Sequence, residues 1–206
     1  MPSTVVHLAI GGVVAAALLR DEFDYRSVAI VLAATALPDL DTFTGLYLQG
    51  THRALLHTLL VPAVGGAVLA YDTRLRAASR LRDYWGARGV RVAWVALAAL
   101  LLGGVAPDLM TNGVNAFYPV YDRFLTVDGK LLLSNQRGVV QTFVDLSATP
   151  ERTTQNTHYW TGVDPTRGDD PKTVERIFPV VRSGFQLLVV GLGAFTLGAR
   201  FWEERQ

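Results

Sequence analysis

The sequence predicts an all-α bundle of about five apolar helices that pass through a membrane, with a polar, partly β-hairpin insertion before the last helix. Half of the 206 residues are hydrophobic, only 18% are charged, and the mean hydropathy is +0.26. The apolar residues gather in five segments without a polar face, which is typical of helices surrounded by lipid or by other helices. The polar residues gather from about residue 120 to 182, after the fourth segment.

The first two apolar segments are expected to form helices over residues 5–19 and 27–37. The first is apolar apart from His7, and Pro38 stops or kinks the second. The second segment is shorter than the roughly 20 residues that cross a bilayer core, although its apolar pattern resumes at 43–48. The N-terminus lacks the basic region of a secretory signal peptide, so we expect the first helix to be retained.

Three further helices are expected over residues 54–71, 92–105 and 183–201. The third helix contains Pro62 and a pair of adjacent glycines, which membrane helices tolerate better than soluble helices do. The alternative is a soluble all-α bundle with unusually apolar helices. The sequence favours the membrane bundle, because soluble helices normally carry a polar face.

The polar insertion contains one hairpin signal and one long loop signal. Residues 124–134 place Asp128-Gly129 between β-favouring flanks, which predicts a type I′ hairpin. Residues 149–172 are rich in Thr, Pro, Gly and Asp, and are expected to form a loop. The predicted organisation is a four-helix membrane core over 1–119, an extramembrane region over 120–182, and a last helix with a short tail over 183–206.

Composition excludes several classes of function. The net charge of +1 gives no electrostatic basis for binding nucleic acid. Because the apolar segments are expected to lie in a membrane, membrane lipids are the expected partners. The chain has no cysteine, which excludes disulfides, cysteine-type zinc sites and thiol nucleophiles. No phosphate-binding glycine loop or nucleotide fingerprint is present.

Titratable residues gather at one end of the predicted bundle. Consecutive helices with short connections run antiparallel, so four of the predicted helix ends lie on one side. These ends hold His7, Asp39, Asp41, His52, His57 and Asp108. Taken singly, each is more typical of a helix cap or a packed side chain. Together, imidazole nitrogens and carboxylate oxygens predict a divalent metal site, with zinc or manganese as the expected ion.

The arginines predict the orientation of the bundle in an inner or cell membrane. Six of them lie between residues 72 and 91, and Arg20, Arg26, Arg200 and Arg205 fall at the same end. The positive-inside rule places this end in the cytoplasm. The candidate metal site is therefore expected on the non-cytoplasmic face.

Several short motifs carry a resemblance to a known family. These are His7, Pro-Asp-Leu-Asp at 38–41, His-Arg-Ala-Leu-Leu-His at 52–57, and Asp-Leu-Met-Thr at 108–111 followed by Gly113 and Tyr118-Pro119. The pattern resembles the predicted membrane-bound metal-dependent hydrolases, some of which are described as LexA-regulated inner-membrane hydrolases. The resemblance covers residues 1 to about 125. It implies a metal-dependent hydrolase.

The chain departs from this pattern at one position. The family usually has a histidine four residues before the aspartate that matches Asp108, and this chain has Gly104 there. One ligand that the resemblance implies is therefore missing. His158, in the predicted loop, is the only histidine left to replace it.

The expected chemistry is metal-assisted hydrolysis at the membrane surface. The ligands would be His7, Asp39, His52, His57 and Asp108. Asp41 would bridge two ions or orient the attacking water, and Arg53 would hold a phosphate oxygen with its planar fork. The depth of these residues favours a lipid or lipid-linked phosphoester as substrate. The alternatives are a catalytically inactive membrane protein that keeps a structural metal or polar cluster, and a transporter.

Overall fold

The computed structural model describes residues 2–143 and 151–206. The helices are α1 (Thr4–Leu18), α2 (Tyr25–Ala36), α3 (Asp41–Gly45), α4 (Leu60–Ala70), α5 (Arg80–Ala99), α6 (Ala106–Leu109) and α7 (Gly184–Glu203). Shorter helical turns lie at Arg20–Glu22, Leu37–Leu40, Tyr71–Leu75 and Leu100–Val105. The strands are β1 (Val114–Phe117), β2 (Tyr121–Leu125), β3 (Leu131–Ser134) and β4 (Gly138–Gln141).

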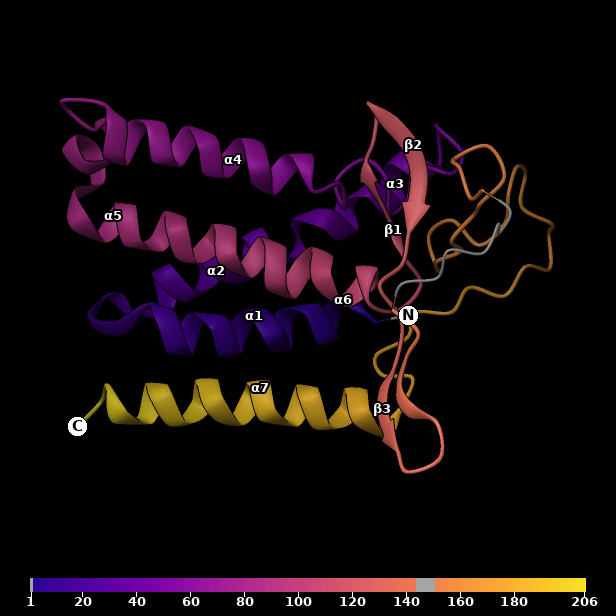
Figure 1. The fold of residues 1–206 in the computed structure, drawn as a ribbon. Coiled ribbons are helices and arrows are strands. Elements are labelled where there is room, and N and C mark those ends of the chain that lie inside the picture. The colour runs from indigo at the N-terminus through magenta and orange to yellow at the C-terminus, as the bar shows by residue number, and fades with distance from the viewer. Residues whose placement is uncertain (1, 144–150) are drawn as a thin grey trace.

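The long helices lie alongside one another, and the strands and the long loop gather at one end of them (Figure 1). α1 packs against α2, α5 and α7, and α2 packs against α5. The N-terminus lies at the end with the strands, and the C-terminus lies at the opposite end (Figure 1). The helix ends at the strand end carry the candidate metal ligands.

Four helices begin at a side chain that caps them. Ser3, Asp24, Ser79 and Ser183 precede α1, α2, α5 and α7, and each side-chain oxygen accepts a hydrogen bond from the backbone N–H three residues later. Such caps satisfy a donor that the helix itself leaves unpaired, and each contributes about 1 kcal/mol. The sequence therefore fixes where the long helices start.

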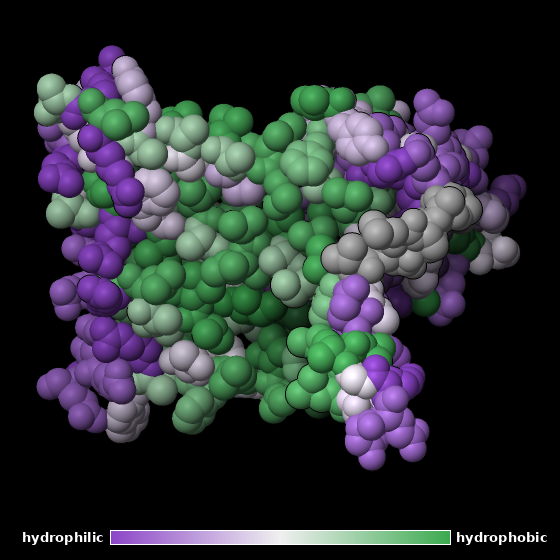
Figure 2. Space-filling model, in the orientation of Figure 1, coloured by the Kyte–Doolittle hydropathy of each residue, from purple (hydrophilic) through white to green (hydrophobic). Residues whose placement is uncertain are grey.

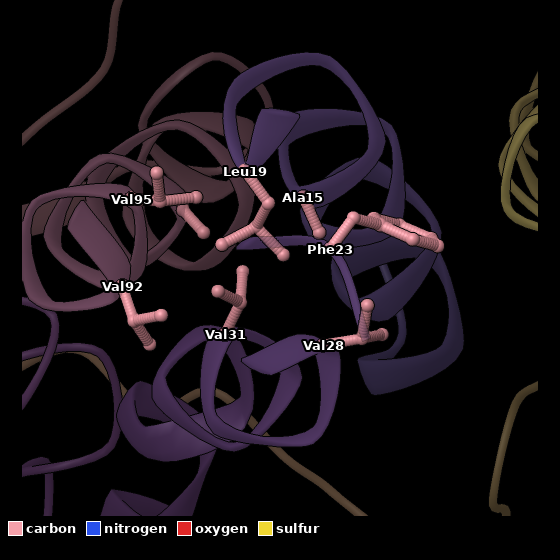
Figure 3. Close-up of a cluster of buried hydrophobic side chains, with 8 residues drawn as sticks. Ala15, Leu19, Phe23, Val28, Val31, Val92 and Val95 are labelled. Carbon is pink, nitrogen blue, oxygen red and sulfur yellow. The ribbon is translucent and has the colours of Figure 1, made fainter. Parts of the chain in front are cut away.

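The main hydrophobic core lies toward the end of the bundle away from the strands. Its buried residues come from the end of α1, the start of α2 and the middle of α5: Ala15, Leu19, Phe23, Val28, Val31, Val92, Val95 and Ala99. Figure 3 shows these side chains converging between the three helices. This packing holds α1, α2 and α5 together, so their other ends are brought close at the candidate site.

Glycines allow close helix contacts nearer the site. A Cβ atom on Gly193 of α7 would lie 2.5 Å from the carbonyl oxygen of Ala9 in α1. A Cβ on Gly103 would lie 2.8 Å from the Thr35 side chain and 3.1 Å from the backbone nitrogen of Gly11. Small residues at such positions let membrane helices approach backbone to backbone.

The predicted five-span all-α bundle is wrong. Within the described residues, three helical stretches are long and apolar enough to cross a membrane: Tyr25–Gly45, Arg80–Leu109 and Gly184–Glu203. α1 has 15 residues and α4 has 11, and at about 1.5 Å per residue both are shorter than a bilayer core of about 30 Å. The apolar surface still forms a band across the helices, with hydrophilic residues at both ends (Figure 2).

Two small antiparallel sheets lie between residues 114 and 141, and the first begins inside the predicted all-α core of residues 1–119. β1 pairs with β2, and β3 pairs with β4. The predicted hairpin around Asp128-Gly129 is wrong, because the strands on its two sides, β2 and β3, each pair with another strand. The backbone nitrogen of Val127 instead donates to the carbonyl of Leu109, which ties the segment to α6. The predicted loop is confirmed from Glu151 onward, and its first two residues lie outside the described range.

Candidate metal centre

Four segments bring the candidate ligands together at the strand end of the bundle. His7 lies in the second turn of α1, and Asp39 lies in the 3₁₀ turn that follows α2. His52 and His57 lie in the irregular segment between α3 and α4. Asp108 lies in α6, which continues α5 through a π-helical turn. All of these side chains are buried except Asp39, whose side chain is 21% exposed.

The ring of His7 is fixed by a backbone carbonyl. Its Nδ1 atom lies 2.6 Å from the carbonyl oxygen of Gly103. Because a carbonyl oxygen only accepts hydrogen bonds, Nδ1 carries the proton and Nε2 keeps its lone pair. Nε2 lies 3.7 Å from Asp108 Oδ2 and 3.9 Å from Asp39 Oδ1. Gly103 belongs to the π-helical turn Leu100–Val105, and such turns occur frequently at functional sites.

His57 approaches the same two carboxylates from the irregular segment between α3 and α4. Its Nδ1 atom lies 2.9 Å from Asp41 Oδ2, so this nitrogen also carries the proton. Its Nε2 atom lies 3.0 Å from Asp108 Oδ2 and 3.7 Å from Asp39 Oδ1. This nitrogen is buried and makes no hydrogen bond to the described residues. When His57 is neutral, the lone pair of this nitrogen is available to a cation.

The spacing of the convergent atoms fits one ion. His7, Asp39 and Asp108 each offer one ligand atom, and these three atoms lie within 4.8 Å of one another. Ions such as zinc are held at about 2.0–2.2 Å by nitrogen and oxygen ligands. Asp39 is held by a hydrogen bond of 2.5 Å that Thr4 donates to its Oδ2 atom. The described residues therefore contain a buried group that could hold a metal ion.

The carboxylate of Asp41 accepts several hydrogen bonds beside this group. Its Oδ1 atom lies 2.8 Å from His52 Nδ1, and its Oδ2 atom lies 2.9 Å from His57 Nδ1. The backbone nitrogens of Arg53 and Leu56 donate to Oδ2 over 3.1 and 3.3 Å. Four donors thus surround a side chain that is fully buried. The roles of bridging ligand and base that the sequence predicts for Asp41 stay predictions, and its contacts are those of a residue that orients two histidines.

Arg53 is fully buried and forms an ion pair with Asp108. Its guanidinium also lies over the ring of Tyr159, with 4.8 Å between its central carbon and the ring centroid. The backbone of Arg53 has a positive φ of 64°, a conformation that a non-glycine residue adopts only when its surroundings enforce it. The enforcing contacts are the bond to Asp41 and a bond of 2.8 Å from Asn115 N to the Arg53 carbonyl.

His52 contacts Asp41 and also lines a cavity of about 280 Å³. Its Nε2 atom is buried and makes no hydrogen bond to the described residues. Asp39, His52 and Asp108 line one wall of the cavity. The structure therefore places an Asp41–His52 pair at the boundary between the candidate metal group and a space that a substrate can occupy.

The structure leaves no space for a side chain at Gly104. A Cβ atom there would lie 2.7 Å from the Thr35 carbonyl oxygen and 3.0 Å from Pro38 Cγ. The position is occupied by the backbone of the α2 end, so a histidine does not fit without moving it. His158 lies 3.9 Å from Asp164 and has no described contact with the metal group. The structure thus fills the Gly104 position with protein and does not bring His158 to replace the missing ligand.

The charges of the centre do not balance within the protein. Asp39, Asp41 and Asp108 are opposed by the guanidinium of Arg53 and by His57: burial lowers the pKa of this imidazole, but the three carboxylates raise it well above its ordinary value of 6.5. This leaves one negative charge in a buried place, and two when His57 is neutral, which costs free energy unless a cation is present. Burial also raises the pKa of the Tyr159 phenol above its usual value of 10.0, although Arg152 and Arg53 act in the opposite direction.

Sequence reasoning missed several residues around the centre. Thr4 and the Gly103 carbonyl hold Asp39 and His7, and Tyr159 covers Arg53. A backbone carbonyl leaves no trace in a sequence pattern, and Tyr159 lies in an aperiodic loop. The threonine one turn before His7 is the only one of these that helical spacing could have indicated.

Comparison with curated proteins and with solved structures found no match. The comparison with family models found one match, described as the YdjM inner membrane protein, over residues 1–161. The matched range contains every candidate ligand, both β-sheets, and two of the three helical stretches that could cross a membrane. It establishes a membrane family and does not establish hydrolysis or metal dependence. The chain belongs to the YdjM inner membrane protein family.

Proposed function

We propose that this protein is a membrane-embedded, metal-dependent hydrolase that acts on a phosphoester of a lipid or of a lipid-linked molecule. Its metal ligands are the Nε2 atoms of His7 and His57 and the carboxylates of Asp39 and Asp108. The observation that carries the proposal is the convergence of these two nitrogens on the same two carboxylates, at distances of 3.0 to 3.9 Å.

The surroundings of the ligands support this assignment. Metal-binding histidines usually donate their other ring N–H to a carboxylate or a backbone carbonyl, which fixes the tautomer and the ring orientation. His57 donates to Asp41, and His7 donates to the Gly103 carbonyl. A ligating His57 is neutral, so the three carboxylates and Arg53 then leave two negative charges, which one divalent ion would neutralise. The donor set, with two imidazoles and two carboxylates, suits zinc or manganese.

The Asp41–His52 pair supplies a base for hydrolysis. A bound divalent ion would supply Lewis-acid polarisation of a phosphoryl oxygen and acidification of a water molecule. His52 Nδ1 is protonated by its contact with Asp41, so His52 Nε2 is free to accept a proton at the cavity wall. Asp41 stabilises the imidazolium that forms when His52 accepts that proton. His52 is thus a base in this proposal, although the sequence pattern suggested a ligand.

Arg53 has a supporting role in the same proposal. Its ion pair with Asp108 and its contact with Tyr159 keep the guanidinium buried, away from the exposed part of the cavity. It therefore fixes the orientation of Asp108 and partly offsets the negative charge of the ligands. The phosphate contact that the sequence predicts for Arg53 stays a prediction, and it requires the Asp108 pair to open.

The test is hydrolysis of bis(p-nitrophenyl) phosphate and of a short-chain phosphatidylcholine by the detergent-purified full chain. The protein is stripped with a chelator and reloaded with zinc or manganese. We expect turnover that depends on the ion and falls at least 100-fold in His52→Gln, while the bound metal is unchanged. His158→Gln is the matched control and keeps full activity, because its ring lies by Asp164. Stoichiometric metal without turnover on any phosphoester would instead favour a structural metal centre.

A further inference from the structure

The cavity beside the metal centre has a second wall that the proposed chemistry does not use. This wall is formed by two parts of the long loop, Trp160–Val163 and Ile177–Arg182, and by the start of α1. Six of its lining residues lie beyond the residues that the family model matches, which end at 161: Gly162, Val163, Ile177, Phe178, Pro179 and Arg182. The wall thus includes residues outside the matched range that contains the candidate ligands.

Specific contacts hold this wall over the centre. The Ser3 hydroxyl, which caps α1, donates to the carbonyl oxygen of Val180. The hydroxyls of Thr42 and Thr161 lie 2.8 Å apart, which joins the loop to α3. The ring of Phe178 packs against Gly162 so closely that a Cβ there would lie 2.6 Å from it. These contacts give the loop a defined position, and the loop encloses one side of the cavity.

Among the described residues, Arg182 lines this cavity without a carboxylate partner. Arg182 is exposed, and its guanidinium lies 5.0 Å from the centroid of the Trp160 ring. In the part of the chain that the structure describes, no ion pair is formed by Arg182, whereas Arg176 pairs with Asp170 and Arg53 pairs with Asp108. An arginine that is stacked on an aromatic ring is preoriented, and its planar fork matches the oxygens of a phosphate.

Much of the rest of the wall is apolar, and the wall lies beside the start of α7. Val5, Ile177 and Phe178 line the cavity and are 37%, 46% and 66% exposed. Arg182 is followed immediately by the capping Ser183 and by α7, a helix long and apolar enough to cross a membrane. Figure 1 shows the start of α7 at the same end as the N-terminus. The cavity therefore combines an arginine with apolar surface, next to a helix that could cross a membrane.

We propose that Arg182 recognises the phosphate of an anionic amphiphile, whose apolar tail lies against Val5, Ile177 and Phe178. The phosphate then lies between Arg182 and the metal centre. With a divalent ion bound, the charges of the centre balance, and Arg182 makes the cavity positive. This inference rests on the proposed function and narrows its substrate to a phosphate-bearing lipid. It assigns recognition of the headgroup phosphate to Arg182, a residue that the motifs near the N-terminus do not include.

The experiment measures binding by calorimetry to the full chain in micelles of a maltoside detergent, which carries no phosphate. All variants carry His52→Gln, so that turnover does not disturb the titration. The probes are dihexanoyl phosphatidate, dihexanoylglycerol and inorganic phosphate. Arg182→Gln is compared with Arg137→Gln, which removes an exposed arginine from the turn between β3 and β4. The metal content of each sample is measured in parallel.

We expect Arg182→Gln to weaken dihexanoyl phosphatidate binding at least tenfold, about 1.4 kcal/mol, and Arg137→Gln to leave it unchanged. Arg182→Lys should give an intermediate loss, because it keeps the charge without the fork. Dihexanoylglycerol and inorganic phosphate should both bind far more weakly. Equal binding by the two glutamine variants would overturn the proposal. Inorganic phosphate that binds as tightly as the lipid would overturn the amphiphile assignment and indicate free phosphate as the ligand.

The metal measurement separates this inference from the proposed function. Absence of metal from every sample would contradict the hydrolase proposal. The contrast between Arg182→Gln and Arg137→Gln would still decide whether the cavity recognises a phosphate lipid.

Discussion

At the scale of single residues, Asp41 determines the geometry of the centre more than any ligand does. It holds the Nδ1 atoms of both His52 and His57, and four donors in all surround its carboxylate. The ligands themselves are each held by one neighbour, such as Thr4 for Asp39. The centre therefore depends on a residue that does not face the cavity.

We predict that Asp41→Asn lowers zinc affinity by about 10- to 100-fold, the usual effect of removing a partner of a metal-binding histidine. An asparagine side chain lacks the charge and can accept from only one of the two imidazoles. Competition titration against a zinc-binding dye measures the affinity. Asp72→Asn is the matched control, because Asp72 also accepts from four donors but lies in the α4–α5 connection. Equal zinc affinity of Asp41→Asn and wild type would show that Asp41 does not orient the ligands.

At the scale of elements, the π-helical turn Leu100–Val105 positions two parts of the centre. It presents the Gly103 carbonyl to His7 and lets α6 place Asp108. It packs against the end of α2 through Gly104, where there is no space for a side chain. The contact between this turn and α2 is therefore needed for the relative position of Asp39 and Asp108.

We predict that Gly104→Ala lowers the melting temperature of the detergent-purified protein, because the added Cβ overlaps the Thr35 carbonyl and Pro38. Overpacking of this kind destabilises by about 1–3 kcal/mol. Gly198→Ala in α7 is the matched control, since a Cβ there meets nothing within 4 Å, and alanine favours a helix. Gly104→His should lower the melting temperature more than Gly104→Ala does, and should add no metal ligand. A Gly104→His variant with raised metal affinity and unchanged stability would contradict this account.

The connection between α4 and α5 carries a pH-dependent contribution to stability. Asp72 accepts hydrogen bonds from the Ser79 hydroxyl, the backbone nitrogens of Leu81 and Arg80, and the Arg76 guanidinium, and these lower its pKa to about 2. Its ordinary pKa is 3.8, so the contribution is present above about pH 4 and is lost as the pH falls toward 2.

We therefore expect the melting temperature of Asp72→Asn to lie below that of wild type at pH 5, with the difference shrinking toward pH 2. Asp83→Asn, in the exposed first turn of α5, is the control for loss of a carboxylate without these bonds. Thermal unfolding between pH 2 and 7 gives the comparison. A difference that stays constant over this range would mean that ionisation of Asp72 does not stabilise the connection.

At the scale of the whole molecule, the arginine-rich end and the candidate metal centre lie at opposite ends of the helices. Figure 2 shows the arginine-rich end as a hydrophilic edge beside the apolar band. We propose that this end is cytoplasmic and that the centre faces the other side, as the distribution of positive charge favours.

Single-cysteine labelling tests this orientation, because the chain has no cysteine of its own. Tyr84→Cys marks the arginine-rich end, and Val120→Cys marks the turn between β1 and β2; both positions are 82% exposed. A membrane-impermeant maleimide should label Val120→Cys in intact cells and Tyr84→Cys only after lysis. The reverse pattern would place the metal centre on the cytoplasmic side.

The sequence indicated the candidate ligands but not the way they are held. His7, Asp39 and Asp108 could be grouped because each lies near a helix end, and antiparallel packing places those ends together. The hydrogen bonds of Asp41 depend on the irregular segment before α4, which has no periodic pattern. The Asp-Gly hairpin signal was misleading because local turn preference was overridden by pairing of β2 and β3 with other strands. Hydrophobicity alone overstated the number of spans, because it did not limit the lengths of α1 and α4.

The most direct test of the central claim is the metal content of the detergent-purified protein, measured by mass spectrometry on wild type, His57→Ala, Asp39→Ala and His158→Ala. We predict near-stoichiometric zinc or manganese in wild type and in His158→Ala, whose ring lies outside the centre. We predict its loss in the other two variants, which each remove one of the convergent ligands. Wild-type protein that binds no metal, even after incubation with excess ion, would contradict the claim that these residues form a metal centre.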